Sequence, residues 1–200
     1  MRELSNNKVI SLINKLVDAV ILSLLWTLCS LPVITIGASS AALYHAVTES
    51  LLQDKGYAYK SFLKSLKLSF RQSIFFTIVF LLFAATFLFI IFFFYNNPMG
   101  FFSQVYSVFC LFCLALTALA GTYAFSLIGR FDLTSKQVLS LVAKFIFRNP
   151  LRSLLLLIVF GLIVNFTVSY PFLLLILPSG YALIASLLME GPVKKYINIQ

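Results

Sequence analysis

Long apolar runs alternate with short basic or polar segments along this chain of 200 residues. The main apolar runs are Leu16–Leu31, Ile74–Phe94, Phe101–Ile128 and Leu151–Met189. A helix needs about 20 apolar residues to cross the hydrocarbon core of a bilayer. The pattern therefore predicts a series of membrane-embedded helices.

The first apolar run is interrupted between Leu28 and Tyr44. Pro32 cannot donate a backbone hydrogen bond and clashes with the preceding turn, so the helix is expected to kink or end there. Gly37 relieves the backbone, and a helix of small residues is expected to resume over Ala38–Leu52. The stretch therefore predicts the bend of a membrane hairpin.

Two segments, 59–73 and one within 130–152, have the pattern of a basic amphipathic helix that lies in the membrane interface. The basic positions are Lys60, Lys64, Lys67 and Arg71 in the first segment, and Lys144 and Arg148 in the second. In the second segment, Val138, Leu139, Val142, Phe145 and Ile146 form the apolar face. Thr134 and Gln137 predict a capping box at its start.

The last apolar run, Leu151–Met189, is too long for one span. Its 39 residues would make a straight helix of about 58 Å, roughly twice the thickness of the hydrocarbon core. The chain is therefore expected to fold back within it, at Pro171 or at Pro178-Ser179-Gly180.

The composition supports the same conclusion, that the helices are embedded in a membrane. The chain is 61% hydrophobic and 10% charged, with a mean hydropathy of +1.01, whereas soluble domains are near 45–50% apolar and about 25% charged. We expect an all-α, polytopic membrane helical bundle, formed by residues 1–200 as one membrane domain. About six membrane-embedded helices, or alternatively five, and two basic interfacial helices account for the pattern.

The net charge of +9 does not indicate nucleic-acid binding, because the basic residues are gathered by position. Three lie in residues 1–15, five in 55–71, five in 130–152 and two in 194–195, whereas the turn Tyr95–Gly100 has no charge. This distribution is typical of the positive-inside rule. It predicts a protein of the cell membrane with both termini in the cytoplasm and basic segments near anionic lipids.

A weak internal repeat relates residues 1–128 to residues 129–200. Each half has K-x-x-F-R followed by Gln or Asn directly before an apolar span, and each has a Leu-Pro step before small residues. Broken helices in repeated halves are common in transporters, where they expose backbone groups to a site. A pair of structural kinks explains the same pattern without a ligand.

Few residues offer chemistry. The candidate ligand or packing residues are Pro32, Thr35, Gly37, Ser39, Tyr44, His45, Glu49 and Asn165. His45 and Glu49 share a helix face and form either a proton or substrate site or the wet side of an interfacial helix. Asn165 either bonds a neighbouring helix or contacts substrate. No nucleotide, hydrolase or zinc motif is present, so we expect neither enzyme activity nor a cofactor or metal.

The stretch Leu24–Tyr44 resembles the YesL-like family, a domain of unknown function in bacterial membrane proteins. The matching positions are Leu25, Trp26, Leu31, Pro32, Val33, Thr35, Gly37 and Ala38, followed by Phe62–Gln72. The resemblance extends more weakly, by hydropathy and the region 148–150, over the rest of the chain. It implies an association with carbohydrate-uptake genes, beside ABC-importer permeases, in low-GC Gram-positive bacteria.

Two functions are compatible with these patterns. The first is an accessory or interaction subunit of a carbohydrate-uptake system. The second is a stand-alone small-solute transporter or channel, with its site at the broken helices around Pro32–Gly37 and Pro178–Gly180. The first predicts co-purification with importer subunits, and the second predicts flux through this chain alone.

Overall fold

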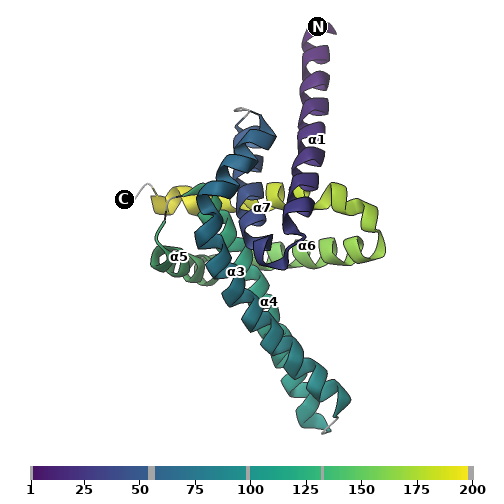
Figure 1. Ribbon diagram of the computed structural model, residues 1–200, viewed down its shortest axis with the longest axis vertical. Coiled ribbons are helices and arrows are strands. Elements are labelled where there is room, and N and C mark those ends of the chain that lie inside the picture. The colour runs from purple at the N-terminus through teal and green to yellow at the C-terminus, as the bar shows by residue number, and fades with distance from the viewer. Residues whose placement is uncertain (1, 54–56, 98–99, 132, 198–200) are drawn as a thin grey trace.

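The computed structural model describes residues 2–53, 57–97, 100–131 and 133–197, and these residues form helices and turns without any strand. The α-helices are α1 (Arg2–Ser30), α2 (Ile36–Ala46), α3 (Ala58–Asn96), α4 (Phe101–Arg130), α5 (Ser135–Arg148), α6 (Pro150–Ser169) and α7 (Leu177–Ile197). Three short segments connect them: η1 (Val33–Thr35), η2 (Val47–Leu52) and η3 (Pro171–Leu175). The all-α helical bundle predicted from the sequence is confirmed (Figure 1).

The predicted bend lies where Pro32 places it. Helix α1 ends at Ser30, the segment η1 forms a single 3-10 turn, and α2 begins at Ile36. Pro32 has an extended backbone, with φ −75° and ψ 112°. The chain therefore reverses through this turn, and α2 packs back against α1.

The amphipathic stretch predicted over 59–73 is helical, but it is not a separate interfacial helix. It is continuous with the following span, so that α3 has 39 residues and a length of about 58 Å. No glycine or proline occurs between Tyr57 and Asn97. Amphipathic and fully apolar sequences have the same backbone preference, so nothing in this segment ends the helix.

Helices α3 and α4 form a long antiparallel pair that extends away from the other helices (Figure 1). Gly100, with φ +66°, completes the turn between them. Toward the turn most side chains are large, apolar and exposed, including Phe89, Phe92, Val108 and Phe109. A surface of this kind is unstable in water and suits a hydrocarbon solvent.

Helix α2 is wedged between α3 and α4, where small residues let the backbones approach closely. A Cβ atom built on Gly129 of α4 would lie 2.1 Å from the carbonyl oxygen of Ala41 on α2. A Cβ on Gly37 would lie 1.9 Å from Thr77 Oγ1 of α3 and 2.4 Å from the Phe125 ring. These two glycines therefore set the spacing of the three helices.

The first half of α3 has a buried stripe of small polar residues. Ser61, Ser65, Ser69, Ser73 and Thr77 are spaced by four and are all buried. Ser69 and Thr77 donate hydrogen bonds to carbonyl oxygens one turn earlier, at 2.8 and 2.7 Å. The spacing puts the stripe on one face of the helix, opposite the exposed basic residues of the same segment.

Helix α5 is amphipathic, as the sequence predicts. In its capping box, Gln137 Oε1 accepts a hydrogen bond from the Thr134 backbone N–H at 2.9 Å. Val138, Val142 and Phe145 are buried, but Leu139, placed on the apolar face by the sequence, is 62% exposed. Leu139 lies about 100° around the helix from Val138, so it points away from the packed side.

Helices α6 and α7 form a second hairpin, which crosses the α3–α4 pair near the end away from its turn (Figure 1). The predicted reversal occurs over Tyr170–Ile176, and Pro171 begins the 3-10 turn η3. Pro178 does not break the chain, because it lies in the first turn of α7, where a missing N–H costs nothing.

Four described helices are long and apolar enough to cross a membrane: Ile13–Ser30 of α1, Ala58–Asn96, Phe102–Arg130 and Pro150–Ser169. The apolar part of α7, Leu177–Met189, is shorter, and α2 has only 11 residues. Of the six membrane-embedded helices predicted, four have full spanning length and two are short.

Candidate functional site

The hydroxyl groups near Pro32 are used to build the bend. Thr35 Oγ1 contacts the carbonyl oxygens of Cys29 and Pro32, each at 2.6 Å. Ser39 Oγ donates toward carbonyl oxygens of the preceding turn at 3.0 Å and lies 2.7 Å from Ser30 Oγ on α1. The Thr35 hydroxyl therefore satisfies a carbonyl group at the end of α1, and Ser39 links α2 to α1 through Ser30.

A second contact links α1 to α2, one turn of α1 further from the bend. Trp26 Nε1 donates a hydrogen bond to Ser40 Oγ at 3.1 Å. Tyr44, 4% exposed, follows one turn later on α2. Tyr44, Thr122 of α4 and Tyr181 of α7 form one hydroxyl cluster, in which Thr122 Oγ1 and the Tyr181 hydroxyl are 2.8 Å apart.

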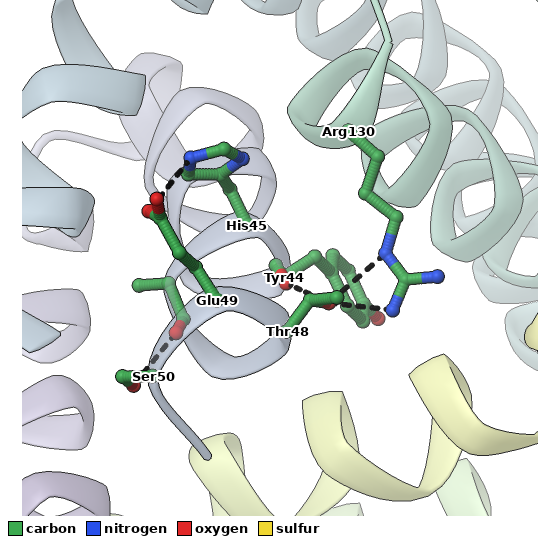
Figure 2. A network of polar contacts seen from close by, with 7 residues as sticks. Tyr44, His45, Thr48, Glu49, Ser50 and Arg130 are labelled. Atoms are coloured by element: carbon green, nitrogen blue, oxygen red, sulfur yellow. Dashed lines mark hydrogen bonds and ion pairs between the residues drawn. The ribbon is translucent and has the colours of Figure 1, made fainter. Parts of the chain in front are cut away.

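The chain after α2 continues into η2, a π-helical segment with one polar pair on each of two sides (Figure 2). Arg130 Nε, at the end of α4, donates a hydrogen bond to Thr48 Oγ1 at 3.0 Å, and Thr48 in turn donates to the Tyr44 carbonyl oxygen at 2.7 Å. His45 Nε2 lies 3.3 Å from a carboxylate oxygen of Glu49, and both side chains are partly exposed. The predicted pairing of His45 and Glu49 on one face is present.

Replacing Thr48 with valine is expected to destabilise the protein, because it removes the acceptor of a charge-assisted hydrogen bond from Arg130. Such a bond contributes about 1.5–3 kcal/mol to the free energy of unfolding. Thermal unfolding in detergent micelles measures the change. Thr86→Val is the matched control, because Thr86 makes the same backbone hydrogen bond within α3 and is exposed. Equal effects of the two changes would show that Arg130 gains nothing from Thr48.

A groove of about 550 Å³ lies between the two hairpins. Helices α3 and α4 form one wall, α6 and α7 form the other, and Trp26 and residues of α2 line part of it. Its lining is almost entirely apolar, with the rings of Phe80, Phe125 and Phe160 among the contributors. Phe80 and Phe125 pack edge to face, with centroids 6.0 Å apart.

The threonine hydroxyl groups in the wall of this groove are hydrogen-bonded to their own helices. Thr77, Thr117 and Thr167 each donate a hydrogen bond to the carbonyl oxygen one turn earlier, at 2.7–2.8 Å. Thr122 does the same at 3.1 Å and also meets Tyr181. The threonine hydroxyl protons are therefore used within the protein, and the groove offers few donors to a polar ligand.

The remaining predicted residues lie outside this region. Asn165 is exposed on α6 and does not line the groove, although its neighbours Val164 and Thr167 do. The predicted basic positions, Lys60, Lys64, Lys67, Arg71, Lys144 and Arg148, are all exposed. The Lys60 ammonium lies over the rings of Tyr57 and Tyr59, 5.0 and 5.9 Å from their centroids.

Several residues of these clusters were not predicted as candidates. Arg130 was counted only as a basic residue, although its place at the end of an apolar run is a signal for a buried partner. The serines of α3 could have been found from their spacing of four. Thr122 and Tyr181 carry no local signal, because only the packing of distant helices brings them to one groove, and Trp26 is marked only as a position of the family pattern.

Long apolar helices, a close-packed small-residue core and an apolar groove define this chain as an α-helical membrane protein. Residues 19–97 match the family described as "Protein of unknown function, DUF624". This match includes the bend and all of α3, and it is consistent with the resemblance to an uncharacterised YesL-like family. Among curated proteins and solved structures, no match was found.

Proposed function

We propose that this protein is a non-enzymatic accessory subunit that acts by binding other components of the membrane. The groove is the observation that carries this proposal, because its threonine donors are used by their own helices. A site that moves a sugar or an ion through the membrane needs exposed hydrogen-bond donors and acceptors. Interaction through apolar surfaces needs none.

The system that it serves is proposed to be a carbohydrate importer of the ABC type. The resemblance to a family associated with such genes supports this, and so does the large exposed apolar surface of the α3–α4 pair. Helices in a bilayer associate by van der Waals packing and small-residue contacts, so this surface suits the spans of a permease subunit. ATP hydrolysis would then belong to other subunits.

The proposed orientation follows from charge. With both termini in the cytoplasm of the cell, the uncharged turn after Asn96 faces outward, and the basic residues of α3 and α5 meet anionic lipids of the inner leaflet. Residues 1–200 then act as a single membrane domain.

A stand-alone small-solute transporter is the second candidate, and the π-helical segment η2 favours it. π-Helical turns inside α-helices are often retained at functional sites. Here Thr48 accepts a hydrogen bond from Arg130, and Glu49 pairs with His45, a pair that could exchange a proton or bind a small polar solute. This site lies next to the hydroxyl cluster of Tyr44.

Affinity purification tests the first candidate. The tagged chain, extracted in mild detergent from its own cells, is expected to retain importer permease subunits that mass spectrometry identifies. A tagged membrane protein of similar size from the same cells is the control for shared apolar contaminants. Recovery of the same proteins with both baits would contradict an accessory role in uptake.

A further inference from the structure

We propose that the groove between the α3–α4 and α6–α7 hairpins is a binding site for one acyl chain of a membrane glycerolipid. Most of the residues that line the groove belong to α1, α3, α4 and α6, which are long and apolar enough to cross the bilayer. Hydrocarbon chains are therefore the molecules that surround it at the highest concentration. The proposal is independent of the importer association.

The size of the groove is compatible with an acyl chain. The groove holds about 550 Å³, which is within the range of sites for small ligands. A flexible acyl chain can follow such a space between the two hairpins.

The polarity of the groove also selects a chain. Thr77, Thr117 and Thr167 have their hydroxyl protons committed to backbone carbonyls. At the end nearest Tyr44, the hydroxyl groups of Thr122 and Tyr181 bond each other. An apolar occupant leaves none of these groups without a partner, but a sugar would find few donors for its own hydroxyls.

The rim of the groove is open to the bilayer on the side of α6. Phe160, Val164 and Val168 line it and are 37%, 45% and 78% exposed. A lipid can therefore place one chain inside while its headgroup remains at the membrane surface. An occupied groove buries apolar side chains on both hairpins, so the lipid would link α6 to the α3–α4 pair.

Neighbouring alanines of α3 provide a matched pair of variants. Ala84 lines the groove, whereas Ala85 is exposed and does not. Ala84→Phe fills the space for the chain, and Ala85→Phe adds the same ring to the lipid-facing surface. Ala118→Phe fills the groove from α4 and replaces Ala84→Phe if that variant fails to fold.

Native mass spectrometry of the full chain, released from detergent after extensive delipidation, counts the phospholipids that it retains. We expect one tightly held phospholipid on the unchanged protein and on Ala85→Phe, and an affinity roughly tenfold or more lower in the groove-filling variants. Equal retention in all variants, or none in the unchanged protein, would overturn the proposal. So would a second protein chain retained in place of lipid and lost in Ala84→Phe.

Trp26 provides a second measurement in solution, because it is the single tryptophan of the chain and lines the groove. Phosphatidylcholine brominated on its acyl chains quenches tryptophan fluorescence at short range. In detergent micelles, quenching is expected to saturate with a single equivalent of this lipid in the unchanged protein and in Ala85→Phe. Quenching that is unsaturable in these two proteins, or equally saturable in Ala84→Phe, would contradict the proposal.

Discussion

Replacing Gly129 with alanine is expected to lower the free energy of unfolding by about 3 kcal/mol, at the upper end for overpacking in a core. The added Cβ would lie 2.1 Å from the Ala41 carbonyl oxygen. That oxygen is backbone and cannot rotate away, so α2 and α4 must separate. Their separation also loosens the contacts of α2 with α3. Thermal unfolding in detergent micelles measures the loss.

Gly161→Ala is the control for this prediction, because a Cβ built on Gly161 meets no atom within 4 Å. This change is expected to be neutral or slightly stabilising, since alanine favours a helix by about 1 kcal/mol over glycine. Gly37→Ala is expected to fall between the two. The atoms that the added Cβ meets belong to the side chains of Thr77 and Phe125, and side chains, unlike a backbone oxygen, can change rotamer. A loss as large at Gly161 as at Gly129 would refute close packing of α2 against α4.

Replacing Phe145 with alanine is expected to cost about 3–5 kcal/mol, the usual range for removing a buried phenylalanine. Phe145 is 1% exposed on the packed face of α5. Its ring lies 5.9 Å from the ring of Tyr123 on α4, measured between centroids. The Tyr123 hydroxyl lies 2.9 Å from Ser153 Oγ of α6, so the cavity would form where three helices meet.

Phe147 on the same helix makes the matched control, because it is 85% exposed. Phe147→Ala is expected to change the free energy of unfolding by less than about 0.5 kcal/mol. The comparison separates a docked α5 from a helix that only lies on the membrane surface. If α5 did not dock, both substitutions would have small effects on unfolding in detergent.

The positions of the helices follow from local signals, and most of them could be predicted. Pro32 ends α1, Pro171 begins the reversal between α6 and α7, and Thr134 caps α5. Each of these residues acts on its own backbone, so its effect is independent of tertiary packing.

The continuity of α3 and the location of the groove could not be predicted in this way. The change from amphipathic to apolar sequence near Ser73 marks a change of surroundings, not of backbone. To locate the groove, one must know how the two hairpins pack against each other, and no pattern in the sequence indicates this. The π-helical turns of η2 depend on one extra residue, and hydrophobic periodicity does not reveal it.

The sequence indicates which residues form polar contacts better than it indicates what those contacts do. His45 and Glu49 do meet, as their spacing requires. Thr35 and Ser39 were candidates for a ligand, but their hydroxyl groups stabilise the bend. Their partners are the Cys29 carbonyl and the Ser30 hydroxyl of α1, which only the folded geometry brings within reach.

Solute flux into liposomes that contain only this chain tests its proposed accessory role most directly. We expect labelled mono- and disaccharides to enter these vesicles no faster than they enter empty vesicles of the same lipid. Sugar flux above that background, abolished by Thr35→Ala or Glu49→Gln but not by the surface change Thr86→Val, would contradict it. That result would assign transport to the bend and the π-helical site instead.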